Sequence, residues 1–525
     1  MDNPGEYRKR PAPAAISRRT LLTVAAAAIG SALLDNTPKI TTQEPPKGGL
    51  PPTPSPYTNP WRHPLPTPPV KEPLADRRSL RGGPVVSAEH QYYSLFAPRK
   101  FYEMTLRPAQ HTFHQDLGPS LIWGYDGIFP GPTFDARYGE PILVRIHNDL
   151  PTNQHGDPNE ALGTLFYHAH RPDFTAPNVY KGQVGFFRAF DDVDTGDETS
   201  GLCLPSGEFD VPLLFADKAF DAEGQLFFDP FNIDGILGDK STVNGVIQPF
   251  FNVQRRKYRF RFLVGGPSRF MRFYLMRNGS FLSNGPFIQI SNDGNLLAEP
   301  IRRNNFVQAP AERFDIVIDF KELIGTAGGE LTLYNRAEQR DGRQPTGRLL
   351  SPGDAILKFI VEPGAPEDRS QVPATLRPQV PVDLSEVVTT RTFRFGRSNG
   401  AWTINDKFFD PRKSRAQIQR GTSEIWVLKN NDDGWQHPIH IHFEEFHILS
   451  RNGVAPPAWE RGRKDVLLLG PLEEVRLFFR FRDFPEPGYM HWDPARQANV
   501  GRYPMHCHNL THEDHAMMLR WDIVG

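Results

Sequence analysis

Residues 258–262 of this 525-residue chain are Tyr258-Arg259-Phe260-Arg261-Phe262, in which aromatic and basic side chains strictly alternate. Successive side chains of a β-strand point to opposite faces, so this alternation predicts a strand with one apolar face. The run Ile142-Leu143-Val144-Arg145-Ile146 has a similar strand-forming composition. We interpret Arg259 and Arg261 as the solvated basic face of a half-buried strand rather than as part of a nucleic-acid-binding patch.

Runs of this kind are separated by glycine- and proline-containing turns, which predicts an all-β protein. The 51 prolines are roughly twice the ordinary usage and disfavour a fold dominated by helices. Hydrophobic residues make up 38% of the chain, which is enough for several packed cores. The 60 Lys and Arg residues almost balance the 61 Asp and Glu residues, so we expect no nucleic-acid partner.

The composition changes at several points along the chain. Arg18-Arg19, followed by an uncharged run from Thr23 to Leu34, resembles a twin-arginine export signal. No later apolar run reaches the roughly 18 residues of a membrane-spanning helix, so we expect an exported protein of the cell envelope or exterior without a stable membrane span. The expected organisation is a signal segment at 1–36, a proline-rich linker or strap at 37–84, and three β-domains at 85–205, 206–365 and 380–525.

Eight of the 17 histidines fall into three short clusters. The clusters are His168-Ala169-His170, then His437-Pro438-Ile439-His440-Ile441-His442, and finally His506-Cys507-His508 followed by His512 and Met517. Residues two apart in a strand point to the same face, so each His-x-His pair can direct two imidazoles at one metal ion. Cys507 points the other way, so one tripeptide can serve two metal sites.

The spacing of Cys507, His512 and Met517 matches a blue-copper site, in which two histidines and a cysteine bind copper and a methionine is a weak axial ligand. His437 is the natural remote histidine of such a site, which leaves His440 and His442 for another centre. A structural zinc site is the weaker interpretation, because it normally has four ligands close in sequence and rarely includes methionine. The other cysteine, Cys203, is expected to be an ordinary buried thiol.

These clusters resemble the second, third and fourth copper-binding motifs of the multicopper oxidases, particularly the bacterial group with laccase, bilirubin oxidase and phenoxazinone synthase. Residues 124–133, 178–182 and 243–245 are also similar, so the resemblance covers most of residues 85–525. It implies three cupredoxin-like Greek-key β-barrel domains. It also implies one-electron oxidation of a small reducing substrate at a blue copper, with reduction of O2 to water at a trinuclear copper cluster.

The resemblance implies a role for each ligand by position. His437, Cys507, His512 and Met517 resemble the blue (type 1) copper ligands, His440 resembles a type 2 ligand, and the type 3 copper pair would be held by His168, His170, His442, His506 and His508. Electrons would then pass from Cys507 through the adjoining backbone to His506 and His508. Glu513 or its neighbour Asp514 could donate protons for O2 reduction, and the alternative is that both are solvated loop acids.

The family's first His-x-His motif is missing from this sequence. Only residues 152–167 lie where relatives have an additional loop and strand with that motif, which predicts an internal deletion and a truncated first domain. By ligand count, His440 alone would remain for the type 2 copper, His168 and His508 for one type 3 copper, and His170, His442 and His506 for the other. His147 and His155 are the candidates to replace a missing ligand.

Two functions remain open. One is a multicopper oxidase that acts on phenols, aromatic amines or tetrapyrroles. The other is an oxidase-derived blue-copper protein with an incomplete cluster, which acts in electron transfer or copper binding with little turnover. Detoxification by oxidation of cuprous ions is a weaker third interpretation, because the chain has only 8 methionines. Tyr, Trp and Arg residues in 455–465 or 490–503 are candidates to line a substrate pocket.

Overall fold

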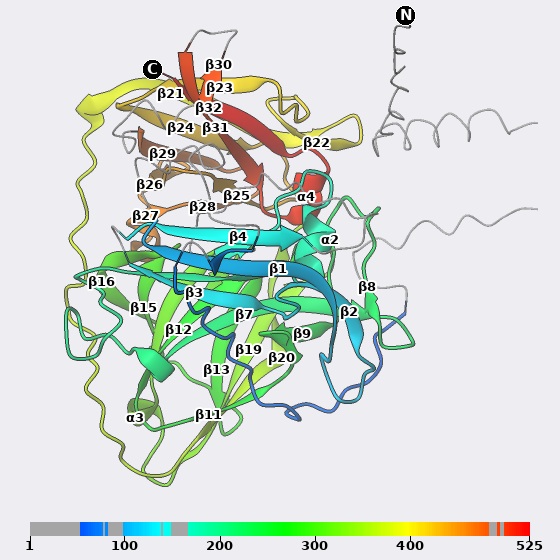
Figure 1. Ribbon diagram of the computed structural model, residues 1–525, viewed down its shortest axis with the longest axis vertical. Helices are drawn as coiled ribbons and strands as arrows, with labels where there is room; N and C mark the ends of the chain where they lie inside the picture. Colours follow the sequence, from blue (N-terminus) through cyan, green and yellow to red (C-terminus); the bar gives the residue numbers. More distant parts are fainter. Residues whose placement is uncertain are drawn as a thin grey trace, which may run out of the picture. The chain divides into compact units, whose positions relative to one another are not determined.

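Six β-sheets contain about half of the described residues, and the helices are few and short, as the all-β prediction requires (Figure 1). The computed structural model describes residues 53–76, 79–81, 98–137, 140–148, 166–481, 491–493 and 498–524. Its three described α-helices are all short: α2 (Thr175–Tyr180), α3 (Phe320–Leu323) and α4 (Leu510–Asp514). None of the helices in this part of the chain is long and apolar enough to cross a membrane. The expected signal segment at 1–36 lies outside the described residues.

The N-terminal sheet pair consists of two three-stranded sheets, with strand orders β2-β1-β4 and β3-β6-β5. Their strands are β1 (Lys100–His111), β2 (Ser120–Tyr125), β3 (Gly131–Arg137), β4 (Ile142–Asn148), β5 (Phe166–His168) and β6 (Val184–Phe190). The predicted strand at 142–146 is therefore confirmed as part of β4. His155 and all but the last two residues of the 152–167 segment, where the deletion is predicted, fall within residues 149–165, which lie outside the described residues.

The middle sheet pair has one eight-stranded and one six-stranded sheet. The first has the order β10-β9-β7-β12-β18-β15-β16 with β8 on β7, and the second has the order β11-β20-β19-β13-β14 with β17 on β13. The strands are β7 (Asp210–Phe220), β8 (Leu226–Phe227), β9 (Lys240–Val243), β10 (Val246–Ile247), β11 (Phe250–Val253), β12 (Lys257–Val264), β13 (Met271–Arg277), β14 (Ser280–Phe281), β15 (Phe287–Asn292), β16 (Asn295–Arg303), β17 (Asn305–Gln308), β18 (Arg313–Asp319), β19 (Gly329–Gln339) and β20 (Pro345–Val361). Aromatic side chains from both sheets, such as Phe262 and Phe273, meet in the core between them.

The C-terminal sheet pair consists of two six-stranded sheets. One has the order β22-β21-β24-β29-β26-β27, and the other has the order β23-β32-β31-β25-β28 with β30 on β31. The strands are β21 (Val387–Ser398), β22 (Ala401–Ile404), β23 (Ser414–Gln419), β24 (Thr422–Asn430), β25 (His437–Ile441), β26 (Phe446–Arg451), β27 (Arg463–Lys464), β28 (Val466–Leu469), β29 (Glu474–Phe481), β30 (His491–Asp493), β31 (Ala498–Cys507) and β32 (Met518–Val524). Antiparallel pairing places His440 of β25 opposite His506 of β31, so the second and third histidine clusters lie side by side.

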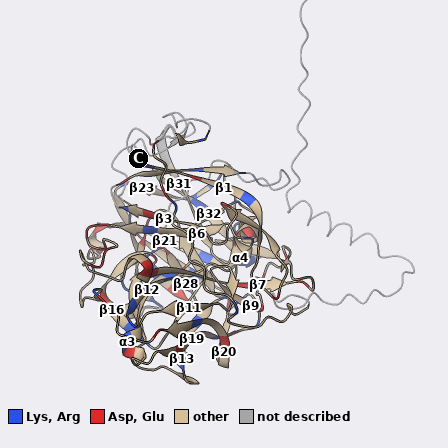
Figure 2. Ribbon diagram, turned by 60° about the horizontal axis from the view of Figure 1, so that its bottom comes forward, with Lys and Arg blue, Asp and Glu red and all other residues tan. Residues whose placement is uncertain are grey.

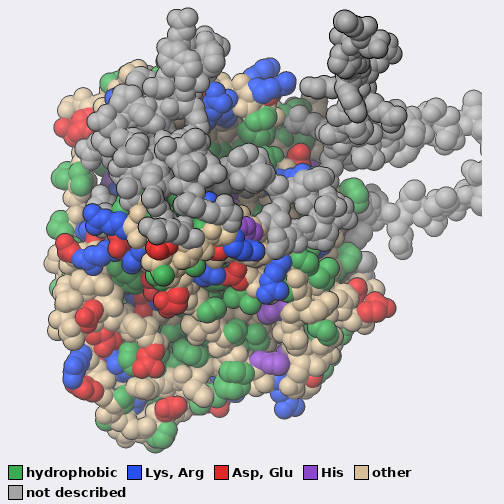
Figure 3. Space-filling model, in the orientation of Figure 1, with side chains coloured by type: hydrophobic (Ala, Val, Ile, Leu, Met, Phe, Trp, Pro, Cys, Tyr) green, Lys and Arg blue, Asp and Glu red, His purple; other side chains and the backbone are tan. Residues whose placement is uncertain are grey.

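Strand β12 confirms the predicted strand at 258–262, but the prediction of a solvated basic face is wrong. Arg259 is only 3% exposed, and it pairs with Asp315 at 2.5 Å and Asp194 at 2.8 Å. Arg261 pairs with Asp210 at 2.8 Å. Because β12 lies between β7 and β18 in the interior of its sheet, carboxylates rather than water neutralise its basic face. In Figures 2 and 3, Lys and Arg are interspersed with Asp and Glu over the described residues, and neither charge dominates the face that is shown.

The proline-rich strap, described at residues 53–76 and 79–81, connects the N-terminal and middle sheet pairs. The Leu65 N–H donates to the Phe250 carbonyl at 2.7 Å, and the Thr133 N–H donates to the Pro69 carbonyl at 2.8 Å. Asn244 adds a side-chain bond from its Nδ2 to the Pro66 carbonyl at 2.8 Å. The strap therefore forms backbone hydrogen bonds with both sheet pairs although proline lacks an amide hydrogen.

A buried ionic network joins the middle and C-terminal sheet pairs. The guanidinium of Arg313, at the start of β18, forms two 2.6 Å bonds with the Asp465 carboxylate, which lies between β27 and β28. The neighbouring Lys464 ammonium lies 2.9 Å from Asp293 and 3.2 Å from Glu312. Removal of one partner from a buried network of this kind typically costs about 3–5 kcal/mol, because a charge is left uncompensated. The network fixes Asp465 directly behind one of the histidine clusters.

Candidate metal centres

The first candidate centre, the Cys507 site, lies inside the C-terminal sheet pair. His437 begins β25 and Cys507 ends β31, while His512 belongs to α4. The Nδ1 atoms of His437 and His512 are 3.2 Å apart, and each is 3.6 Å from the Cys507 Sγ. The point equidistant from these three atoms lies about 2 Å from each, within roughly 0.3 Å of typical metal–nitrogen and metal–sulfur bond lengths. Three buried donor atoms thus surround a space of the size of a metal ion.

Met517 completes the residues predicted for this site. Its side chain is fully buried, its N–H donates to the His512 carbonyl at 2.9 Å, and its carbonyl accepts the Cys507 N–H at 3.1 Å. These bonds tie Met517 to two of the other three ligands. A cysteine, two histidines and a methionine form the donor set that soft, redox-active copper prefers over zinc.

The protonation states of the Cys507 site favour a bound cation. Burial lowers the pKa of His437 to about 3 and lowers the pKa of His512 well below its usual value, so both imidazoles are neutral near pH 7. The His512 Nε2 donates to the Asp234 carbonyl at 3.2 Å, which leaves the Nδ1 lone pair directed at the site. Burial also raises the pKa of the Cys507 thiol, and a metal cation reverses this effect because it binds the thiolate.

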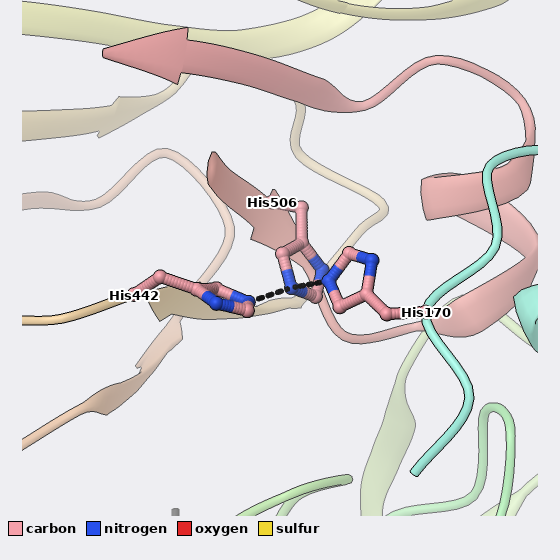
Figure 4. A group of neighbouring side chains, drawn as sticks. All are labelled: His170, His442 and His506. Atoms are coloured by element: carbon pink, nitrogen blue, oxygen red, sulfur yellow. Dashed lines mark hydrogen bonds between the residues drawn. The ribbon is translucent and has the colours of Figure 1, made fainter. Parts of the chain in front are cut away.

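The second candidate centre, the histidine cluster, lies where the N-terminal sheet pair meets the C-terminal pair. Its members are His168, His170, His440, His442, His506 and His508. The Nε2 atoms of His170 and His442 lie 3.0 and 3.2 Å from the His506 Nε2, and Figure 4 shows the three rings pointing toward one another. A separate contact of 3.3 Å joins the Nε2 atoms of His168 and His508. The His440 ring lies beside that of His442, with 4.5 Å between their centroids.

Hydrogen bonds behind the cluster orient its rings. The Nδ1 of His168 donates to the Ala169 carbonyl at 2.8 Å, and the Nδ1 of His440 donates to the Asp465 carbonyl at 2.9 Å. Each bond fixes the proton on Nδ1 and leaves the Nε2 lone pair for a metal ion. Burial, and then the neighbouring histidines, lower the pKa of His168 and of His440 to about 3. His168 and His440 are therefore neutral imidazoles near pH 7, and their Nε2 lone pairs are suited to bind a cation.

The two acids that follow His512 are both buried, so the alternative of solvated loop acids is wrong. A Glu513 oxygen lies 2.9 Å from the His506 Nδ1, and the other lies 3.5 Å from the His170 Nδ1. Burial by itself raises the pKa of Glu513, but His506 and His170 outweigh this effect and bring the pKa to about 2. Asp514 does not face the cluster in this way, because its oxygens accept the N–H groups of Thr175 and Ala176 at 2.9 and 3.0 Å.

The structure places the remaining candidates elsewhere. The His147 Nε2 lies 3.3 Å from a carboxylate oxygen of Glu103, on the adjacent strand β1. The Cys203 thiol, expected to be buried, is partly exposed. In the 455–465 segment, the Trp459 ring packs against the Arg303 guanidinium. The backbone carbonyl of Trp459 accepts a hydrogen bond from the Asn292 side chain. Most of residues 490–503 lie outside the residues whose side chains are described.

Sequence reasoning missed the groups that surround His512. The Trp402 ring lies 4.0 Å from the His512 ring, centroid to centroid, and the Trp435 ring lies 5.6 Å away. The Arg343 guanidinium lies 4.7 Å from the Trp435 ring centroid and pairs with Asp234 at 3.2 Å. Trp435 stands only two residues before His437, so its closeness in sequence could have indicated it. Asp234 and Arg343 gave no comparable signal, since only folding brings them from the middle sheet pair to this site.

The fold and the two centres define a β-sheet protein with a cysteine–histidine metal site beside a polyhistidine metal site. Residues 379–524 match the family described as multicopper oxidase. The chain is 34% identical over 493 residues to bilirubin oxidase from Albifimbria verrucaria, covering 87% of this chain and 80% of that protein. It is 29% identical over 524 residues to a laccase from Bacillus subtilis strain 168, covering 81% of this chain and 94% of that protein.

Solved structures give the same result. The McoA multicopper oxidase from Aquifex aeolicus aligns with a TM-score of 0.69 and 25% identity, covering 82% of this chain and 97% of that structure. This chain belongs to the multicopper oxidase family, and the expected set of three cupredoxin-like domains is confirmed. The Cys507 site resembles a type 1 copper site, and the histidine cluster suggests further copper sites.

Proposed function

We propose that this chain is an oxidase that couples one-electron oxidation of phenols, aromatic amines or tetrapyrroles to the reduction of O2 to water. The observation that carries the proposal is the tripeptide His506-Cys507-His508. Its cysteine belongs to the Cys507 site and its histidines belong to the histidine cluster. A continuous covalent path of adjacent residues therefore connects a site for substrate electrons with a site for O2. Relatives named bilirubin oxidase and laccase support this class of substrate.

Bound copper would supply the one-electron redox chemistry at both sites. His437, Cys507, His512 and Met517 would hold it at the Cys507 site, and the six histidines would hold it in the cluster. The carbonyls of Ala169 and Asp465 orient two of those histidines. Glu513 is a buried carboxylate 2.9 Å from the His506 Nδ1, where it would relay protons by accepting one and passing it on to the cluster. Asp234, Trp402 and Trp435 enclose His512 and form the side from which substrate electrons would arrive.

Copper content measured together with O2 uptake tests the proposal. We expect a blue protein that loads copper at both the Cys507 site and the cluster and consumes O2 with a phenolic substrate. After removal of copper by a chelator, both the colour and the O2 uptake should disappear and then return when copper is added back. A blue protein that takes up no O2 would contradict the proposal.

The second candidate function is an electron-transfer or copper-binding protein with little turnover. The missing first His-x-His motif favours this function. Among the described residues, the histidine rings that contact one another at the cluster are those of the six histidines named above. This function predicts substoichiometric copper in the cluster with an intact blue site. The same measurement of copper and O2 uptake therefore separates the two functions.

We also propose that the protein is exported by the twin-arginine route, on the motif Arg18-Arg19 and the apolar run that follows it. This route carries folded proteins, which suits a chain that binds copper before export. Replacement of both arginines by lysine should leave the protein in the cytoplasm, as measured by cell fractionation. Unchanged export of this double variant would rule out the route.

A further inference from the structure

Helix α2 (Thr175–Tyr180) lies immediately after His168 and His170 in the sequence and beside α4 in Figure 1. Its first turn has no side-chain cap from its own N-cap residue, Phe174. The cap comes instead from α4, because the Asp514 carboxylate accepts the N–H groups of Thr175 and Ala176 at 2.9 and 3.0 Å. Both oxygens of a buried acid in the C-terminal sheet pair thus hold the start of α2.

The other end of α2 is held from the middle sheet pair. The Lys218 side chain of β7 is fully buried, and its Nζ donates to the carbonyl of Tyr180, the last residue of α2, at 2.5 Å. The same Nζ lies 4.0 Å from the Tyr180 ring centroid, and the Tyr180 hydroxyl accepts the Ala219 N–H at 2.7 Å. Burial lowers the pKa of Lys218 to about 7, but an amine donates this hydrogen bond in either protonation state.

The two ends of the segment that contains α2 are hydrogen-bonded to each other next to His168. His168 pairs with Val184 in the β5–β6 ladder, and the Ala169 N–H donates to the Gln183 carbonyl at 3.1 Å. Residues 168 and 184 are therefore held together while α2 forms the loop between them. A shift of α2 relative to the other two sheet pairs would carry His170 with it.

We propose that α2 fixes His168 and His170 against His506 and His508, and that Asp514 and Lys218 are the positioning residues that hold its two ends. The inference rests on the proposed copper cluster, since it concerns the alignment of that cluster's ligands.

The physical basis lies in the length of the helix and the hydrogen bonds at its two ends. A six-residue helix is too short to be stable alone, so external bonds must hold it. Hydrogen bonds with Asp514 and Lys218 supply partners for the first N–H groups and the last C=O group of α2, which have none within the helix. Both groups are buried, so loss of either leaves backbone N–H or C=O groups without a partner and destabilises that end of the helix.

The first test compares Asp514→Ala with Asp319→Ala. Asp319 is a matched control, because it also accepts two backbone N–H groups of a short helix, those of Lys321 and Glu322 in α3. In the metal-free protein we expect amide exchange over residues 169–183 to be at least about 10-fold faster in Asp514→Ala, and unchanged there in Asp319→Ala. We also expect the copper affinity of the cluster to fall about 10–100-fold while the blue absorption of the Cys507 site is retained.

The second test approaches α2 from its opposite end. Lys218→Met removes the bond to Tyr180 from β7, away from α4, so it should give the same faster exchange and the same selective loss of cluster copper. Asp514→Asn keeps one acceptor oxygen and should show an intermediate effect, and it replaces the alanine variant if that protein does not fold. Unchanged exchange at 169–183, or equal loss of copper from both sites, would overturn the proposal. Amide exchange is measured on the metal-free protein. The exchange result therefore tests the role of α2 even if the wild-type protein shows no O2 uptake.

Discussion

The Cys507→Ser variant should lack the blue absorption and should oxidise a phenolic substrate more than about 100-fold more slowly than the wild type. Replacement of a group that only supports a ligand already costs roughly 10–100-fold, and Cys507 is the proposed ligand itself. A serine hydroxyl is a hard, weakly acidic donor and does not replace a thiolate that binds soft copper. The variant should keep its histidine cluster, because His506 and His508 point away from residue 507.

Visible absorption and O2 uptake in the same sample measure this effect. Cys203→Ser is the matched control: Cys203 is the second cysteine, and its partly exposed thiol belongs to neither centre. This control should keep both the colour and the activity. Oxidation at the wild-type rate by Cys507→Ser would show that substrate electrons do not pass through this site.

The Glu513→Gln variant should reduce O2 about 100- to 10,000-fold more slowly, which is the usual contribution of a positioned acid or base. Glutamine has nearly the same size and can occupy the same place beside the His506 Nδ1, but it cannot transfer a proton. The blue absorption should therefore remain, and a phenol should bleach it without O2 at the wild-type rate. Only reoxidation by O2 should become slow.

Stopped-flow absorption with and without O2 separates these two half-reactions. Glu424→Gln serves as the control, because Glu424 is a buried acid of the C-terminal sheet pair that bonds to Arg391 and Trp426. It should leave reoxidation unchanged even if it lowers stability. If Glu513→Gln reoxidises as fast as the wild type, protons reach the cluster by another path.

The histidine clusters show how far local sequence reasoning extends. Alternation in a strand determines that His506 and His508 share a face and that Cys507 lies on the other, and this follows from backbone geometry alone. The partnership of Cys507 with His437 also follows from a donor pattern that few metals other than copper favour. By contrast, the interpretation of Arg259 and Arg261 was wrong, because alternation does not reveal whether a face meets water or acids from neighbouring strands.

Several site features depend on contacts between residues far apart in the sequence. Asp234 orients His512 from 278 residues away, and Asp465 orients His440 through its carbonyl. Glu513 and Asp514 are adjacent acids with the same local surroundings in the sequence. One faces the histidine cluster and the other caps α2. No propensity or spacing separates them, because folding decides that Glu513 meets His506 and His170 while Asp514 meets the start of α2.

The sequence by itself determined the all-β class, the identity of the donor atoms and the two-sided character of His506-Cys507-His508. These properties follow from side-chain chemistry and from the two-residue period of a strand, both of which are local. Only the tertiary structure decided which histidines meet, which acid faces them and what holds α2 at both ends. Those outcomes depend on how three sheet pairs pack against one another, since buried charges and helix ends must find partners wherever the packing supplies them.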